Sequence, residues 1–452
     1  MSINSRQETD TPIGFTEVKR QTSDPRLRWS WVEPSIWTEN MLTALENGVK
    51  GGKWFSIIDK VYSLKTLKLA WAKVKANKGA AGVDGVSIER FTTNEDKYLQ
   101  ELSNELKEGS YSPQPVKKVY IPKGKGKTRP LGIPTIKDRV AQQAAKLVLE
   151  PILENEFLST SYGFRPNKGA KDALREVDKL LKVGDTWVVD VDITEFFDTI
   201  PHEKLMDKLR NYVADRKYLQ LVEKWLNQKI MEEGKAWNPI KGSPQGAVLS
   251  PLLANLYLHD LDVLMKNKGF RMIRYADDFV ILTDNETDAR RALEIIQKWT
   301  MENDLTTHPE KTHVGNCLIE GQGFDFLGYR FECRKKWVRR KSISNFRDKV
   351  RQMTKRTCGK SIEKVIEKLN PTLRGWYNYF KHVDKWDMNT FDAFVRRRLR
   401  AILRKFNKRP GFGRSSRDHK EWPNSFFANL SLFSMHKTRG LEIACQSRCG
   451  NS

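Results

Sequence analysis

The chain has 452 residues, with 80 Lys or Arg against 56 Asp or Glu, which gives a formal net charge of +24. A chain of this length can bury more than one hydrophobic core, so we expect two or three domains. The positive charge predicts a polyanionic partner, and the lack of any apolar run of about 18 residues excludes an ordinary membrane-spanning helix.

The positive charge is concentrated in the last quarter of the chain. Residues 330–452 carry 32 basic and 10 acidic residues, whereas residues 1–329 carry 48 and 46. This imbalance predicts that phosphate groups bind mainly to the C-terminal part. An anionic membrane surface is the competing partner, but the sequence carries no lipidation motif.

The five cysteines form no paired framework, which is typical of a reducing compartment. Cys445 and Cys449, with His436 nearby, resemble half of a zinc site but lack a second cysteine pair. The N-terminus carries Glu8 and Asp10 and no hydrophobic segment, so it does not resemble a targeting signal. We therefore expect a cytoplasmic protein.

The periodicity of apolar residues predicts the elements in chain order. Residues 1–40 are polar and weakly periodic and are interpreted as an arm that could be flexible. The elements expected after it are helices over 41–80, a strand over 117–121, a basic hairpin loop over 123–127, a helix over 137–157 broken at Pro151, a buried strand over 186–193, a strand–turn–strand hairpin over 272–283 and a helix over 284–299.

Beyond residue 328 the pattern changes to helices with apolar stripes and basic opposite faces. The stripes lie over residues 343–353, over 362–369, where Pro371 is expected to end the helix, and over 391–406. We interpret the stripes as core. The basic faces are either a phosphate-binding surface or plain solvated surface.

Residues 274–282 carry the strongest chemical signal. Asp277 and Asp278 stand between Tyr275 and a β-prone apolar run, as expected for two carboxylates at the tip of a hairpin. Carboxylates without nearby His or Cys favour a hard divalent cation such as magnesium. Two such ions about 4 Å apart promote in-line phosphoryl transfer. On these residues alone, a solvated Asp-Asp turn is equally compatible.

A third carboxylate is expected from the strand over 186–193. Asp190 and Asp192 are two residues apart, so both point to one face of a sheet. A carboxylate among the apolar residues of a buried strand requires a metal or a cationic partner. Asp192 lies nearer the C-terminal end of the strand and is the preferred ligand, with Asp190 as the alternative.

Ten short blocks in order relate the chain to a known family. The blocks are 82–85, 120–134, 162–166, 192–198, 242–251, 275–278, 309–312, 326–329, 373–380 and 422–427. With these blocks the chain resembles group II intron-encoded reverse transcriptase/maturases from about residue 60 to its end. No Cys/His-rich H-N-H cluster is recognised after Trp422, so the chain resembles the bacterial type without that endonuclease domain, which must borrow a primer.

The resemblance implies an α+β fold: a right-hand polymerase of fingers and palm, with an antiparallel palm sheet, followed by an α-helical thumb or maturase domain. The implied domains are an arm at 1–40, N-terminal helices and fingers at 41–185, the palm at 186–330, the thumb/maturase domain at 331–410 and a short DNA/RNA-binding tail at 411–452.

The resemblance also assigns a catalytic site. Asp192, Asp277 and Asp278 are expected to bind two Mg²⁺ ions, with the carbonyl of Ile193 as a further ligand. Phe197 is expected to exclude a 2′-hydroxyl, although, like Phe196, it could be plain core. The other residues expected near the nucleotide triphosphate (dNTP) are Lys123 and Arg129 as charged donors to the triphosphate, Gln245 and Gly246 beside nucleotide and template, and Lys311 as proton donor to pyrophosphate or as a surface salt bridge.

Nucleic acid is expected to contact basic and aromatic residues outside this site. Such residues suit phosphate contacts and stacking on a folded RNA. They are Arg165, for the template, and Arg374, Trp376, Tyr377, Arg396, Arg397, Arg398 and Arg400 in the C-terminal helices.

The expected function is that of an RNA-directed DNA polymerase that copies intron RNA by two-metal nucleotidyl transfer, and of a maturase that aids splicing and retrohoming. The expected partners are group II intron RNA, an RNA template with a DNA primer, target DNA and dNTPs, and no membrane. Two alternatives are a splicing-only RNA-binding maturase and a related reverse transcriptase recruited to phage defence. The complete aspartate set argues against the first, and the lack of a recognisable fused domain against the second.

Overall fold

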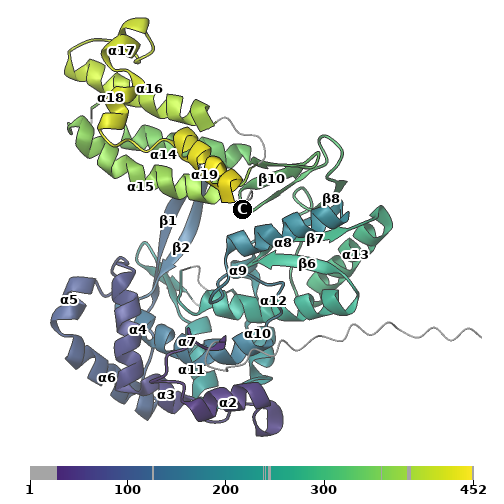
Figure 1. The fold of residues 1–452 in the computed structure, drawn as a ribbon. Helices are drawn as coiled ribbons and strands as arrows, with labels where there is room; N and C mark the ends of the chain where they lie inside the picture. Colours follow the sequence, from purple (N-terminus) through teal and green to yellow (C-terminus); the bar gives the residue numbers. More distant parts are fainter. Residues whose placement is uncertain are drawn as a thin grey trace, which may run out of the picture.

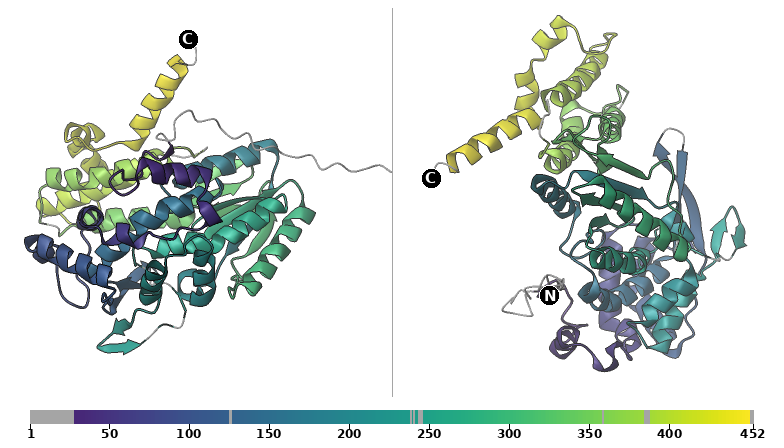
Figure 2. Two further views of the ribbon diagram at one scale, coloured as in Figure 1. Left: turned by 90° about the horizontal axis from the view of Figure 1, so that it is seen from below. Right: turned by 90° about the vertical axis from the view of Figure 1, so that its right-hand side faces the viewer.

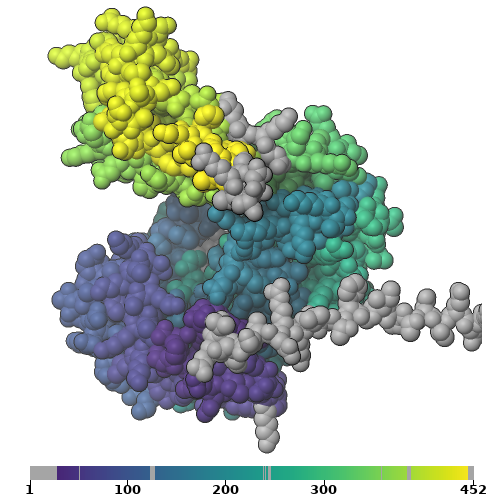
Figure 3. Space-filling view, viewed as in Figure 1, coloured from purple at the N-terminus to yellow at the C-terminus, as the bar shows by residue number. Residues whose placement is uncertain are grey.

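The computed structural model describes residues 28–124, 127–237, 239, 241–242, 246–357, 359–383 and 388–449. They form an N-terminal helical region with a β-hairpin, a central sheet with flanking helices, and a C-terminal helical region (Figure 1). The surface is hollowed between these three regions (Figure 3). This order agrees with the expected fingers, palm and thumb. No helix in these segments is long and apolar enough to cross a membrane.

One long helix, α7 (Ile136–Glu156), organises the N-terminal region and is buried on almost every side. The shorter helices of this region are α2 (Glu39–Asn47), η1 (Lys50–Gly52), α3 (Ile58–Tyr62), α4 (Leu64–Ala76), α5 (Ile88–Thr93) and α6 (Glu95–Glu108). The predicted break at Pro151 is wrong, because α7 continues through it. A proline inside a helix costs about 3 kcal/mol, and burial of Ile152 and Leu153 beyond it offsets that cost.

The described end of the predicted arm belongs to the folded core. Trp29 and Trp37 are buried, and the indole of Trp37 donates to the carbonyl of Leu147 at 3.3 Å. Trp37 also packs edge-on against Trp54. Residues 28–40 are therefore anchored on α7 by aromatic burial, which weak periodicity does not reveal. Residues 1–27 of the predicted arm lie outside the described residues.

A small sheet forms the fingers. Strands β1 (Val116–Gly124) and β2 (Lys127–Ile133) make the expected basic hairpin, which projects from the body of the molecule (Figure 2). Strand β4 (Ile230–Glu232) runs parallel to β1 and pairs with β5 (Lys235–Trp237), giving the order β2-β1-β4-β5.

The palm sheet has the order β6-β7-β3-β8, and all its neighbouring strands are antiparallel. Its strands are β3 (Trp187–Asp192), β6 (Arg271–Tyr275), β7 (Asp278–Thr283) and β8 (His313–Asn316). The helices around it are α8 (Ala170–Val183), α9 (Phe196–Thr199), α10 (His202–Arg210), α11 (Arg216–Leu226), α12 (Ser250–Asn267) and α13 (Glu286–Glu302). The predicted buried strand and the predicted hairpin are confirmed.

Both faces of the palm sheet are covered. Val189 and Val191 of β3 point to one core, shared with α12, α13 and the N-terminal helices. Val188 points to a second core, formed with α8 and the strand β9 (Phe324–Phe326). Successive residues of a strand face opposite sides, so a strand covered on both sides must be apolar almost throughout. Asp190 and Asp192 are exceptions to this rule, and both lie on the face of the sheet that α8 covers.

The C-terminal region begins with a β-meander of β9, β10 (Tyr329–Glu332) and β11 (Lys335–Val338). The helices that follow are α14 (Arg340–Met353), α15 (Ile362–Phe380), α16 (Met388–Phe406), α17 (Ser416–Glu421), α18 (Asn424–Asn429) and α19 (Met435–Cys449). The predicted apolar stripes form one core, which includes Phe346, Leu369 and Val395. Helix α15 passes through Pro371 without ending, since buried Leu373 and Tyr377 continue its stripe.

Two expected domain boundaries differ from the structure. Residue 331 falls inside β10, so the helical thumb begins only after Val338. The expected tail at 411–452 is not separate, because Trp422, Phe427 and Met435 are buried in the same core as α14, α15 and α16. Only the later part of α19 projects from this core (Figure 2).

Candidate active site

The palm sheet brings the three predicted catalytic aspartates together at one end. Strand β3 ends at Asp192, which lies opposite Asp278, the first residue of β7. Tyr275 pairs with Asp278, so the turn between β6 and β7 consists of Ala276 and Asp277 alone. Of these two residues only Ala276 has a positive φ, +60°, as in a type II′ hairpin turn. The short turn therefore places Asp277 beside the Asp192–Asp278 pair.

Burial and mutual repulsion make Asp277 and Asp278 hard to ionise. The pKa of Asp278 is raised to about 7, first by burial and then by the charges of Asp277 and Asp192. Burial likewise raises the pKa of Asp277, and the charge of Asp192 adds to the rise. A hard divalent cation would relieve this repulsion, so the donor set fits magnesium. The described side chains nevertheless form no group of three or more His, Cys, Asp or Glu arranged to hold a metal.

Asp190 belongs to the same cluster of charge but lies further inside the sheet, opposite Val280 and His313. Burial raises its pKa to about 7, followed by the charges of Asp278 and Asp325. Of the two β3 carboxylates, Asp192 is the one whose charge acts on Asp277. This geometry favours Asp192 over Asp190 as the third ligand.

The carbonyl of Ile193 lies just beyond β3. Ile193 bridges to Thr307, but the two hydrogen bonds of this bridge run from Thr194 N–H to Thr306 and from His308 N–H to the carbonyl of Asp192. The carbonyl of Ile193 itself is outside these two bonds, which is compatible with its predicted role as a ligand.

A buried network beneath the turn holds it in place. The side chain of Arg274 has no solvent exposure and forms an ion pair with Asp262 of α12, with Nε at 2.7 Å from Oδ1. Its Nη1 donates to Asn255 at 2.9 Å and to the carbonyl of Ala276 at 3.0 Å. Asn255 in turn donates to the carbonyl of Gly163 at 2.8 Å. These bonds connect α12 and β6 to the catalytic turn.

Gly163 allows the segment before α8 to lie directly against the catalytic turn. A Cβ atom at this position would lie 2.3 Å from the backbone nitrogen of Ala276. Sequence reasoning missed the roles of Gly163, Asn255, Asp262 and Arg274. The available signal was a charged residue inside a buried strand, together with two polar residues in the apolar helix over 250–267.

The structure describes three of the residues predicted around the triphosphate, namely Arg129, Lys311 and Gly246. Arg129 is exposed on β2, and its charge lowers the pKa of Asp277. Lys311 donates to Oδ2 of Asp192. Gly246 has φ of +110°, and a Cβ there would lie 2.4 Å from the carbonyl oxygen of Gly132 in β2. Gln245 and the side chain of Lys123 lie outside the described residues.

Phe196 and Phe197 differ in burial, although both are equally apolar. Phe196 is 2% exposed and lies in the core, whereas Phe197 only packs partly against it. Of the two rings, that of Phe197 therefore keeps an exposed part, and its role as the gate against a 2′-hydroxyl stays a prediction.

Three residues expected to touch nucleic acid are buried in the protein instead. The guanidinium of Arg165 is paired with Glu154 and donates to the carbonyl of Ser161. Arg400 donates to the carbonyl of Trp422 at 2.9 Å. Tyr377 is 1% exposed. Each of these polar groups has a partner inside the protein or no access to solvent. We therefore conclude that these residues stabilise the fold and do not contact nucleic acid.

The other predicted contacts remain at the surface to different degrees. Arg374 is exposed and lies over the ring of Phe433. Trp376 is half-buried and stacks on Phe346 with ring centroids 4.2 Å apart. Arg398 donates to the carbonyl of Thr354 at 2.6 Å, so part of its hydrogen-bonding capacity is used within the thumb. Arg396 and Arg397 are half-buried.

The charge crowding generates a stability prediction for Asp278→Asn in EDTA. The folded-state pKa of Asp278, about 7, lies above the ordinary value of about 3.9, so ionisation destabilises the fold increasingly as pH rises from about 4 to 7. We expect the variant to melt at least about 2 °C above wild type at pH 8, and with little difference near pH 4.5. Exposed Asp96→Asn should change neither midpoint. A lower midpoint for Asp278→Asn at pH 8 would contradict the prediction.

Comparison with known proteins identifies two domain families in order. Residues 121–331 match the reverse transcriptase (RNA-dependent DNA polymerase) family, and residues 343–422 match the group II intron, maturase-specific domain. Among solved structures, the partial Cas6-RT-Cas1--Cas2 complex has a TM-score of 0.36 at 25% identity, covering 55% of this chain and 41% of that chain.

Two curated relatives are similar to this chain. Protein YkfC of Escherichia coli strain K12 is 33% identical over 302 residues, which cover 56% of this chain and 77% of that protein. The group II intron-encoded protein LtrA of Lactococcus lactis subsp. cremoris is 37% identical over 195 residues, which cover 43% of this chain and 32% of that protein. With both domain families present in order, this chain belongs to the group II intron-encoded reverse transcriptase/maturases.

Proposed function

We propose that the protein is an RNA-directed DNA polymerase that copies its group II intron RNA into DNA, and a maturase that binds the same RNA to aid splicing and retrohoming. The observation that carries the polymerase function is the pairing of Asp192 with Asp278 beside Asp277 at the end of the palm sheet. The splicing-only alternative is not favoured, because a chain that only binds RNA has no use for three crowded carboxylates, two of which, Asp277 and Asp278, have a raised pKa.

Asp192, Asp277, Asp278 and the carbonyl of Ile193 would hold two magnesium ions. When bound, these ions supply Lewis-acid activation of the primer hydroxyl and neutralise charge on the triphosphate. The protein contributes further positive charge through Arg129, on the fingers strand β2. The ammonium of Lys311 reaches Asp192, which supports the proposal that it donates a proton to the departing pyrophosphate.

The buried network around Arg274 keeps the turn at fixed geometry. A positive φ at a non-glycine residue such as Ala276 costs about 1–3 kcal/mol and persists only where neighbours enforce it. The hydrogen bond from Arg274 to the carbonyl of Ala276 and the close packing of Gly163 supply that enforcement. We therefore assign Arg274 as a positioning residue for Asp277.

Extension of a primed RNA template with dNTPs and Mg²⁺ tests the polymerase function. We expect Asp277→Ala and Asp192→Asn to lose more activity than the roughly 10–100-fold that loss of an outer-shell partner costs. Asp190→Asn, two residues away on the same strand, should retain most of the extension. RNA-assisted splicing by Asp277→Ala should be largely intact. Equal loss of splicing and extension would contradict the separation of the two functions.

The same assay with NTPs in place of dNTPs tests Phe197 as the gate against a 2′-hydroxyl. Removing the ring should admit the larger sugar, so Phe197→Ala should raise the ratio of NTP to dNTP incorporation by about 10-fold or more. Phe197→Tyr, which keeps the ring, should leave the ratio near that of wild type. An unchanged ratio for an active Phe197→Ala enzyme would exclude the gate.

A cluster of arginines on α14 and α16 is the proposed surface for RNA. Burial lowers the pKa of Arg397, and the charges of Arg414, Arg351 and Arg347 lower it further. Arginines this close repel one another unless an anion joins them, and phosphate is the anion that suits a planar guanidinium. The rings of Phe406, the last residue of α16, and of Phe412, six residues further on, are exposed, as stacking on bases requires.

Salt titration of RNA binding tests this surface. The double change Arg347→Gln/Arg397→Gln removes about two phosphate contacts, so we expect the slope of log K against log salt to become shallower by about 1–2. The matched control is Arg290→Gln/Arg291→Gln on α13, where both arginines already pair with acids. A control that changes the slope as much as the test pair would argue against a localised surface.

A further inference from the structure

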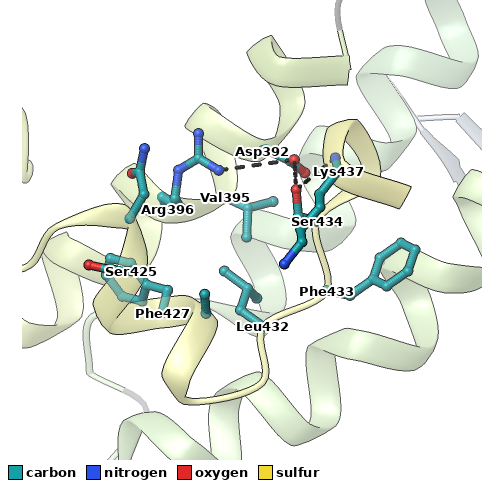
Figure 4. A pocket seen from close by; sticks show the side chains of 11 residues that line it. Asp392, Val395, Arg396, Ser425, Phe427, Leu432, Phe433, Ser434 and Lys437 are labelled. Carbon is teal, nitrogen blue, oxygen red and sulfur yellow. Dashed lines mark hydrogen bonds and ion pairs between the residues drawn. The ribbon is translucent and has the colours of Figure 1, made fainter. Parts of the chain in front are cut away.

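A pocket lies between α16, α18 and the start of α19, outside the catalytic site. Its volume is about 230 Å³. Arg396, Asp392 and Lys437 lie along one side, and Phe427, Leu432 and Phe433 lie along the other (Figure 4). The pocket therefore combines a cationic side with an apolar side.

The cationic side has hydrogen-bonding capacity that the protein does not use. The Nε atom of Arg396 is buried and has no hydrogen-bond partner, although Nη2 donates to Asn389 at 3.3 Å. A buried donor without a partner costs about 1–3 kcal/mol. Lys437 is exposed at the rim, and within the described residues no acid forms an ion pair with it.

The one carboxylate in the lining is occupied elsewhere. Asp392 accepts hydrogen bonds from the hydroxyl of Ser434 at 2.7 Å and from the backbone of Met435 and His436 at 3.1 and 3.2 Å. It thus caps the N-terminus of α19, and it also forms a long ion pair with Arg396, whose Nη1 lies 4.0 Å from Oδ2. The net character of the pocket is that of a site for an anion attached to an apolar group.

The size of the pocket indicates part of a larger molecule. Sites for whole small molecules measure roughly 300–1,000 Å³, so this pocket holds less than a typical ligand. One nucleotide has the required chemistry, with a flat apolar base and a phosphate. In RNA, such units are available where bases are unstacked in loops and bulges, whereas bases within a duplex are not.

We propose that this pocket binds a single unstacked nucleotide of the intron RNA, with the base against Leu432 and Ala428 and its phosphate on Arg396 and Lys437. The proposal rests on the proposed maturase function and deepens it. The arginine surface of α14 and α16 contacts phosphates only. The pocket adds to it a site that recognises one extruded base.

The test compares two variants that add the same side chain at exposed alanines. Ala428→Leu, on α18, fills the apolar side of the pocket, and Ala393→Leu, on α16, lies outside it. The probes are a 20-nucleotide single-stranded RNA and the same sequence in a duplex, titrated at one salt concentration. Melting curves establish that both variants fold.

We expect Ala428→Leu to weaken binding of the single strand by about 10-fold or more and to leave duplex binding unchanged. Ala393→Leu should alter neither, and Arg396→Gln should weaken the single strand preferentially. If Ala428→Leu left the affinity for the single strand unchanged, the pocket would not be a nucleotide site. It would then bind another occupant, such as a peptide side chain. Equal losses of affinity for both RNAs would overturn the base site, because the pocket would then bind phosphate alone. Wild type that binds neither RNA would overturn the maturase function itself.

Discussion

The ion pair between Arg274 and Asp262 is the interaction on which the catalytic geometry depends. Both side chains are fully buried, and removing two charges from water costs several kcal/mol per ion unless further hydrogen bonds satisfy them. Here Asn255 and the carbonyl of Ala276 accept further hydrogen bonds from Arg274. The pair forms only when α12 is docked on β6, so a correctly shaped turn and a correctly packed palm arise together.

The position of the carboxylates follows from how the palm is covered. Helices α12 and α13 close one face of the sheet, and α8 with β9 closes the other. Charged residues are therefore tolerated at the end of the sheet, where Asp192 and Asp278 face one another across β3 and β7. Ionisation of Asp278 is unfavourable in the protein alone, and a bound cation would relieve that cost.

Sequence reasoning reached the palm strands, the aspartate hairpin and the apolar stripes of the thumb, because alternation and helical periodicity encode these features locally. It failed for Arg400, because burial of this arginine depends on a partner distant in the chain: Arg400 donates to the carbonyl of Trp422, which lies on the segment after α17. It also failed for Arg165, whose partners Glu154 and Ser161 are close in the chain but are brought to it only by the fold. It likewise missed Trp37, whose partners Trp54 and Leu147 come from two other segments. Local pattern does not report such contacts.

The continuous core beneath the palm also limits how the molecule can move. Trp37, Leu149, Tyr257 and Phe279 belong to one cluster that joins the N-terminal helices to the palm, whereas the thumb has a core of its own. Close-packed interiors resist sliding. Phe380 and Val383, at the end of α15, pack into the second core of the palm, so the base of the thumb is held as well. The β1–β2 hairpin and the outer part of the thumb are left as the parts free to move around a template. The aspartates would then stay fixed relative to α7 during each cycle, and translocation would be a movement of the nucleic acid past a stationary centre.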